Sequence, residues 1–246
     1  MSDALQRELA YHEKLYSGFA QSHFARPAVR ALRRHMVARI LAATGAGRGS
    51  RVLSLGCGIG DTELLLAAHV GEVTGIDLSP AAIRQARADA AALGIGNARF
   101  EEGTSADGRF DVVIAIFFLH HLPDEELAAL PFRLKDQLAP GGVFYSLDPS
   151  RHRLSGVVGR LLIPGLMKKY QTEDERELDA ETTASLFRAA GLEAKVEMYD
   201  FASSPLAGLF PGWRAGYEMA RRVDDVLLRV GVLRRRGSNF EVIARE

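Results

Sequence analysis

The sequence predicts an α/β protein built on a parallel β-sheet, and two observations carry this prediction. Short apolar runs alternate along the chain with stretches whose apolar residues recur at helical spacing. One of these runs, residues 110–118, is apolar on both faces, as is typical of strands that helices cover on both sides. Strands that alternate with helices in this way favour parallel pairing.

The composition is that of a folded globular protein, because 47% of the 246 residues are hydrophobic and 25% are charged. This length favours one domain. The 31 basic and 31 acidic residues balance, so we expect no general attraction to nucleic acid. The single cysteine, Cys57, excludes an internal disulfide, and no signal-peptide pattern or membrane-length apolar run is present. The sequence therefore predicts a cytoplasmic protein.

Two helices are expected before the first strand. Apolar residues at steps of three and four predict a helix over residues 5–19. Pro27 is expected to begin the second helix, and Gly45 is the first of three glycines that end it. The predicted buried face of this second helix consists of Val29, Leu32, Met36 and Ile40.

Strands and helices then alternate. The expected strands are residues 52–55, 72–77, 98–102, 110–118, 143–147, 193–201 and 239–244. The expected helices are residues 61–70, 80–93, 123–138 and 179–190. Ser79 caps the second of these helices, and Pro140-Gly141-Gly142 predicts a turn. A further helix before the last strand is expected to carry one apolar stripe made of Trp213, Tyr217, Ala220, Leu227 and Val230.

The glycine-rich segment 56–60 follows the first strand and precedes its helix. Glycines at such a turn let the backbone bend sharply and let a ligand lie against the main chain. Asp77 ends the second strand, where a carboxylate can accept both hydroxyl groups of a ribose. Together these features predict a nucleoside ligand.

Two cofactor classes share this geometry. A dinucleotide site needs glycine at the first, third and sixth places, and Asp61 stands at the sixth place counted from Gly56. A carboxylate there repels a pyrophosphate and tolerates an amino group. We therefore favour a ligand without phosphate, and an NAD(P)-dependent oxidoreductase stays as the alternative.

At this point the chain resembles the class I S-adenosylmethionine-dependent methyltransferases, over about residues 50–150. The matching segments are Val52–Gly60, Gly75–Ser79, Glu102–Thr104, Phe110–Ala115, Leu119–Leu122 and Leu138–Gly142. The resemblance implies a Rossmann-like, seven-stranded, mostly parallel sheet flanked by helices, with an antiparallel last strand. It also implies a single domain over residues 1–246, with a helical N-terminal cap (1–48), a cofactor-binding core (50–150) and acceptor-side inserts with closing strands (151–246).

The cofactor that the resemblance implies is S-adenosyl-L-methionine. The residues that it assigns to the cofactor are Gly56, Cys57, Gly58, Asp77, Leu78, Thr104, Ser105 and Ile116. The family often has an acidic residue two places before the first glycine, where this chain has the neutral Ser54. The histidines lack metal-ligand spacing, so no metal is expected.

Methyl transfer to a hydroxyl group or an acidic carbon also needs a base. By resemblance, His121 is the first candidate, with a structural histidine as the alternative reading. His120 is expected to pack or face away, because neighbouring strand residues point to opposite sides. Asp148 is a candidate wall of the acceptor pocket, and an N-terminal tyrosine, Tyr11 or Tyr16, is a candidate to close it.

The predicted reaction is methylation of a small apolar or aromatic molecule at oxygen, nitrogen or carbon. Residues 154–169 and the apolar group Leu206, Leu209, Phe210 and Trp213 are expected to cover the acceptor, with a core layer or dimer contact as the alternative. A basic rim around residues 154–169 also raises a weak membrane-surface contact as a hypothesis. No nucleic acid partner is expected, the oligomeric state stays open, and a non-catalytic regulator that binds the cofactor is a third reading.

Overall fold

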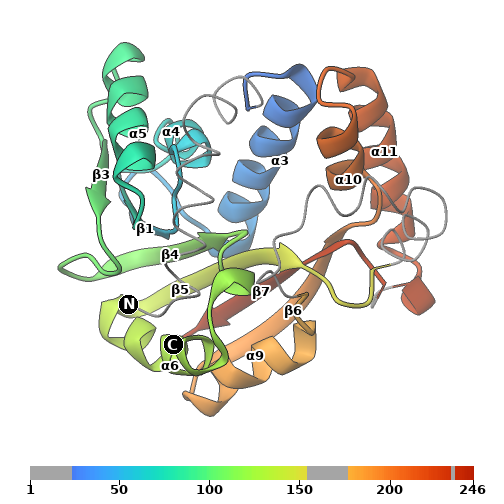
Figure 1. Cartoon of the computed structure of the whole chain (residues 1–246). Coiled ribbons are helices and arrows are strands. Elements are labelled where there is room, and N and C mark those ends of the chain that lie inside the picture. Colours follow the sequence, from blue (N-terminus) through green and yellow to red (C-terminus); the bar gives the residue numbers. More distant parts are fainter. Residues whose placement is uncertain (1–23, 154–176, 234–235) are drawn as a thin grey trace.

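The computed structural model describes residues 24–153, 177–233 and 236–246, which form a seven-stranded sheet covered by helices on both faces (Figure 1). The strands are β1 (Arg51–Leu55), β2 (Glu72–Asp77), β3 (Ala98–Glu102), β4 (Phe110–Ile116), β5 (Leu138–Pro149), β6 (Glu193–Asp200) and β7 (Asn239–Arg245). Their order in the sheet is β3-β2-β1-β4-β5-β7-β6. Because β7 alone runs antiparallel to its neighbours β5 and β6, the predicted mostly parallel sheet with a reversed last strand is confirmed.

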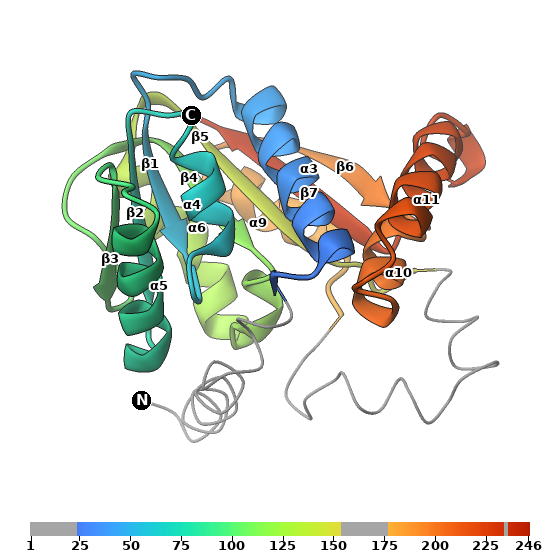
Figure 2. The same cartoon turned by 90° about the horizontal axis from the view of Figure 1, so that it is seen from above.

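The helices form one layer on each side of the sheet. The helices are α3 (Pro27–Thr44), α4 (Asp61–Leu66), α5 (Pro80–Ala92), α6 (Asp124–Gln137), α9 (Ala180–Ala189), α10 (Ser203–Leu209) and α11 (Arg214–Leu227), with the short 3-10 helices η1 (Leu119–His121) and η2 (Gly231–Leu233). Figure 2 shows α5, α4, α3 and α11 in a row across one face, while α6 and α9 cover the other face in Figure 1. Within the described part of the chain, no helix is long and apolar enough to cross a membrane.

Helix α3 agrees with its prediction at both ends. It begins at Pro27 and ends at Gly45, whose φ of 75° lies in the left-handed region that favours glycine. All four residues of the predicted buried face are buried. The helix predicted over residues 5–19 lies outside the described residues.

Helix α4 is shorter than predicted, because it ends at Leu66 rather than at residue 70. The side-chain amide of Asn97 donates hydrogen bonds to the carbonyl oxygens of Ala67, Val70 and Gly71, at 2.9, 3.2 and 3.3 Å. These contacts satisfy carbonyl groups at the end of the helix and let the chain turn into β2.

Strands β4 and β5 have boundaries that differ by two or more residues from the prediction. Strand β4 ends at Ile116 rather than at residue 118, because Phe117 adopts a φ of 54°. The predicted turn at Pro140–Gly142 instead lies inside β5. Phe110 pairs with Leu138 and Val112 pairs with Val143, so the extra residues form an irregularity in the strand.

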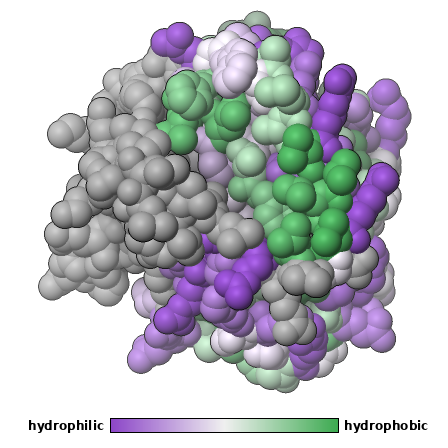
Figure 3. All heavy atoms as spheres, turned by 90° about the vertical axis from the view of Figure 1, so that its right-hand side faces the viewer, coloured by the Kyte–Doolittle hydropathy of each residue, from purple (hydrophilic) through white to green (hydrophobic). Residues whose placement is uncertain are grey.

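The helix predicted before the last strand is α11, but the prediction that it carries a single apolar stripe is wrong. Tyr217 and Ala220 are buried, but Trp213 and Val230 are 51% and 43% exposed. Met219, Val223 and Val226 of α11 are also exposed. Figure 3 shows a hydrophobic patch in green on the side of the molecule that carries α11. The sequence interpretation also missed the short helix α10.

Candidate functional site

The glycine-rich loop connects the end of β1 to α4, at the carboxyl edge of the parallel strands. Gly56, Gly58 and Gly60 all have positive φ, of 63°, 54° and 76°. A Cβ atom on Gly56 would lie 2.3 Å from Cδ2 of Phe118, which follows β4. Glycine is therefore required here by the backbone turn and by the Phe118 ring, a packing contact that the sequence did not predict.

Asp77 joins this loop to the end of the neighbouring strand β2. Its Oδ2 atom accepts a hydrogen bond from the backbone amide of Gly58 at 2.8 Å, and its Oδ1 atom accepts one from Ser79 at 2.8 Å. Each carboxylate oxygen has a second lone pair, so both oxygens can still accept a ribose hydroxyl group. The carboxylate that the sequence assigns to a ribose thus lies directly against the glycine-rich loop.

The other residues assigned to the cofactor follow neighbouring strands. Leu78 is half-buried beside Asp77, while Thr104 and Ser105 are exposed in the loop after β3. Asp77 pairs with Glu102 of β3, so these loops leave the sheet side by side. Ile116 ends β4, which pairs with β1 on the other side. The fold brings the assigned positions to one edge of four adjacent strands.

Cys57 is packed rather than reactive. Burial raises the pKa of its thiol well above the usual value, and the nearby Glu63 carboxylate raises the pKa further. A Cβ atom on Gly75 of β2 would lie 2.9 Å from the Cys57 sulfur. The side chain therefore fills space between the loop and β2.

The neutral Ser54, which stands where the family often has an acidic residue, lies beside the carboxyl group of Glu63. The Ser54 hydroxyl donates a 2.6 Å hydrogen bond to Oε1 of Glu63, which α4 contributes. The two residues are 1% and 2% exposed, and Glu63 Oε2 has no hydrogen-bond partner among the residues that the structure describes. Sequence reasoning missed Glu63, although an acidic residue next to the buried Leu64 and Leu66 is a signal.

The charges around the loop fit a cationic ligand better than a phosphate. Asp61 begins α4 and is paired with Arg33 at 2.6 Å, whereas the Glu63 carboxyl lies nearby without a basic partner among the described residues. Asp77 adds a third carboxyl group. S-adenosylmethionine carries a sulfonium and an ammonium group and has no phosphate. The unpartnered Glu63 oxygen and the acidic helix start are therefore compatible with it.

Replacement of Glu63 by glutamine should change how stability depends on pH. Burial raises the pKa of the Glu63 carboxyl from 4.5 to about 7, and the Ser54 hydrogen bond opposes the rise. Between these pH values the folded protein holds a proton that the unfolded chain has lost, so stability falls as pH rises. Because of Glu63, the free energy of unfolding of the wild type should fall by about 3 kcal/mol between pH 4.5 and 7. The Glu63→Gln protein should not show this fall. Urea unfolding from pH 4 to 8 measures it.

The control for this experiment is Glu101→Gln, because Glu101 is an exposed glutamate on β3. It should leave the pH dependence of the wild type unchanged. A Glu63→Gln protein that follows the wild-type curve across this pH range would contradict the raised pKa.

The two histidines lie at the carboxyl edge, just after β4. Nδ1 of His120 lies 3.0 Å from Oδ1 of Asp148, and both side chains are buried, with 8% and 0% of their surface exposed. The backbone amide of His120 donates to the same oxygen at 3.3 Å. His121 is half-buried, and its ring centroid lies 3.9 Å from that of His120.

Asp148 thus holds His120 in place and is itself inaccessible to solvent. An ionised carboxylate only accepts hydrogen bonds, so opposite an ionised Asp148 the hydrogen of this contact is on Nδ1 of His120. His120 is buried, as expected, but the premise was wrong, because both histidines lie in the 3-10 helix η1 rather than on a strand and their rings lie close together. The Asp148 contact was not predicted. Tyr11 and Tyr16 lie outside the described residues. Within the described ranges, no three or more His, Cys, Asp or Glu side chains are grouped as a metal site.

The known proteins and the family model that this chain matches, reported below, are all methyltransferases. A family model described as "Methyltransferase domain" matches residues 52–142. The ubiquinone biosynthesis O-methyltransferase of Aromatoleum aromaticum is 31% identical over 179 residues, which are 66% of this chain and 71% of that protein. The 23S rRNA (uracil(1939)-C(5))-methyltransferase of Xylella fastidiosa is 45% identical over 69 residues, or 28% of this chain and 16% of that protein.

This chain matches only 66% and 43% of the length of two other curated relatives. Among solved structures, the magnesium protoporphyrin IX methyltransferase of Synechocystis PCC 6803 superposes with a TM-score of 0.65 at 16% identity. That superposition covers 97% of this chain and 99% of the other, and it shows a shared fold.

Proposed function

Since this chain belongs to the class I S-adenosylmethionine-dependent methyltransferases, we propose that it transfers a methyl group from S-adenosylmethionine to a small apolar or aromatic molecule. The observation that carries the proposal is the 2.8 Å hydrogen bond from the Gly58 amide to Asp77. This bond holds the glycine-rich loop against the Asp77 carboxylate, which we assign to the ribose, at the carboxyl edge of the sheet. One domain then combines the cofactor core with an acceptor side built from residues after β5.

The cofactor, when bound, supplies an activated methyl group on sulfur, so the protein has to align the acceptor with that methyl group. Gly56, Gly58 and Asp77 would hold the cofactor, and Glu63 would place a carboxyl group near its cationic end. Leu78 would lie on the adenine, with Thr104 and Ser105 at its edge. Ile116 would border the amino end.

The proposed acceptor side is at the same edge of the sheet. Pro149 of β5 pairs with Asn239 of β7, and Asn239 pairs with Asp200 of β6, so the chain after β6 leaves from the edge that holds Asp148. This chain continues into α10 and the exposed Phe210 and Trp213, whose rings meet edge to face at 6.3 Å. Exposed aromatic rings on the chain that leaves this edge support an apolar or aromatic acceptor.

His121 is the proposed base, with His120 and Asp148 as positioning residues. His121→Ala should lower kcat by about two orders of magnitude or more, as loss of a general base does, and should change S-adenosylhomocysteine affinity less than twofold. Asp148→Asn should lower kcat by about tenfold and shift the pH profile of kcat/KM, because an amide no longer fixes the His120 tautomer.

These constants are measured by donor-label transfer and by calorimetry. His69→Ala, which changes an exposed histidine in the turn after α4, is the matched control and should leave kcat unchanged. A larger loss of cofactor affinity than of kcat in His121→Ala would make it a binding residue instead.

Two experiments test the function itself. Calorimetric titration with S-adenosylhomocysteine and with NADH separates a methyltransferase from a nicotinamide-dependent oxidoreductase, and we expect only the first to bind. Incubation of cell-extract metabolites with labelled donor should give a product heavier by one methyl group. Cofactor binding without any labelled product would instead favour a non-catalytic regulator.

A further inference from the structure

We propose that a second pocket, between α3 and α11, binds a small molecule through a phosphate group. The pocket has a volume of about 540 Å³. Figures 1 and 2 both show α3 and α11 side by side, and a 2.9 Å hydrogen bond from the Ala28 amide to the Pro211 carbonyl joins the chain segments at their starts. None of the residues that line this pocket belongs to the glycine-rich loop.

The walls of the pocket are strongly basic. Five arginines line it, Arg30 and Arg34 from α3 and Arg214, Arg221 and Arg222 from α11, together with a single described acid, Glu218. The spacing of four residues between Arg30 and Arg34 places both guanidinium groups on one side of α3.

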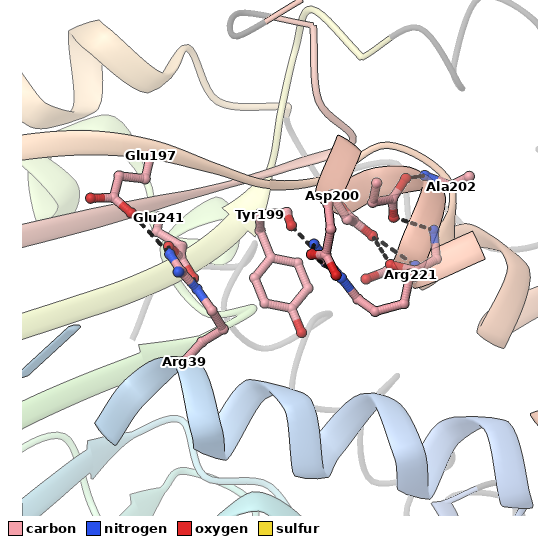
Figure 4. A network of polar contacts seen from close by, with 11 residues as sticks. Arg39, Glu197, Tyr199, Asp200, Ala202, Arg221 and Glu241 are labelled. Atoms are coloured by element: carbon pink, nitrogen blue, oxygen red, sulfur yellow. Dashed lines mark hydrogen bonds and ion pairs between the residues drawn. The ribbon is translucent and has the colours of Figure 1, made fainter. Parts of the chain in front are cut away.

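Only two of these arginines are neutralised within the described part of the chain. Arg214 pairs with Glu218 at 2.6 Å, and Arg221 pairs with Asp225 at 2.6 Å. Arg221 also donates to the Tyr199 carbonyl oxygen at 2.8 Å, and Figure 4 shows it extended beneath the end of β6. The remaining three have no acidic partner among the described residues. Like charges gathered in one pocket repel one another, and a bound anion relieves the repulsion.

Two neutral polar groups in the same wall have no hydrogen-bond partner among the described residues. They are the hydroxyl group of Tyr217, a residue that is 3% exposed, and Nε2 of His35. Burial raises the pKa of the Tyr217 hydroxyl, so it remains a hydrogen-bond donor at neutral pH. Burial and the charge of Arg221 lower the pKa of His35 to about 4, so its ring is neutral there. A buried polar group without a partner indicates a missing ligand atom or water.

Phosphate satisfies these groups better than a carboxylate does. A phosphate monoester carries up to two negative charges and three terminal oxygens, which match three unpaired guanidinium forks and two neutral polar groups. The pocket volume lies within the range of small-molecule sites, about 300–1,000 Å³, and so favours a small ligand over a macromolecule. S-adenosylmethionine has no phosphate, so the cofactor itself is not the occupant.

Calorimetry with inorganic phosphate and with phenyl phosphate tests the site. The full chain is titrated at constant ionic strength, both alone and after saturation with S-adenosylhomocysteine. We expect saturable binding with one site per chain in both cases. Tighter binding of phenyl phosphate identifies a phosphate ester as the ligand, and equal binding identifies the free anion.

The variants locate the binding. Arg34→Gln/Arg222→Gln should weaken phosphate binding tenfold or more, and Tyr217→Phe should weaken it severalfold. The control Arg48→Gln/Arg84→Gln removes two exposed arginines elsewhere and should bind as the wild type does. Unfolding in urea checks that each variant is folded. If one of the pocket variants is not folded, Arg30→Gln is tested in its place. Absence of saturable binding, or equal weakening in the pocket and control variants, would overturn the proposal.

Discussion

Replacement of Asp77 by alanine is expected to weaken S-adenosylhomocysteine binding by about 3 kcal/mol, which is roughly a 150-fold increase in Kd. The variant loses the acceptor for the ribose hydroxyl groups. It also loses the carboxylate that holds the Gly58 amide, so the glycine-rich loop is no longer tied to β2. Both losses act on the same ligand, and calorimetric titration measures their sum.

Asp77→Asn separates the two effects. An asparagine keeps one acceptor oxygen in the same place but has no charge, so its loss of affinity should lie between those of the wild type and the alanine variant. Circular dichroism and urea unfolding check that each protein is folded. An Asp77→Ala protein that is folded and binds the ligand as tightly as the wild type would refute the assigned role.

Arg39→Met is expected to lower the free energy of unfolding by about 3–5 kcal/mol, the usual cost of leaving a buried charge without its partner. Figure 4 shows Arg39 reaching from α3 to Glu241 of β7 and Glu197 of β6. Glu241 is fully buried, and its only other side-chain hydrogen bond within the described residues is a 2.7 Å bond from the Tyr145 hydroxyl. Urea unfolding at pH 7 measures the effect.

The double variant Arg39→Met/Glu241→Gln should recover at least half of this loss, because it leaves no unpaired buried charge. Glu197→Gln is the matched control. Glu197 is the second partner of Arg39, but its side chain is 41% exposed, so its removal should cost less than about 1 kcal/mol. If Glu197→Gln destabilises the protein as much as Arg39→Met does, the Glu241 pair is not the main contribution.

The sequence was sufficient for the elements that local signals define. Helix α3 begins at a proline and ends at a glycine with positive φ, and both signals are visible in the sequence. It was insufficient where a distant residue sets a boundary. Helix α4 ends early because the Asn97 amide binds the carbonyls after it, and Asn97 lies about thirty residues away. Periodicity records only the near neighbours of a residue, so it cannot show such a contact.

The candidate site divides in the same way. The glycine-rich loop and Asp77 follow consecutive strands, and the parallel pairing of β1 and β2 was enough to predict that they meet. The contact between Ser54 and Glu63 depends on how α4 is rotated against β1, which the sequence alone did not reveal. The phosphate pocket proposed above combines arginines from segments nearly two hundred residues apart, so no local pattern pointed to it.

The position of β7 has a consequence for biosynthesis. This strand lies between β5 and β6, although the ribosome makes it after both of them. Until residues 239–245 emerge, β5 and β6 each present an open edge to other chains, which is the usual starting point of misassembly. The first four strands, β1 to β4, can pair as they are translated, but β5 and β6 cannot be joined until β7 has been made. The nascent protein is most exposed to aggregation between the synthesis of β6 and that of β7.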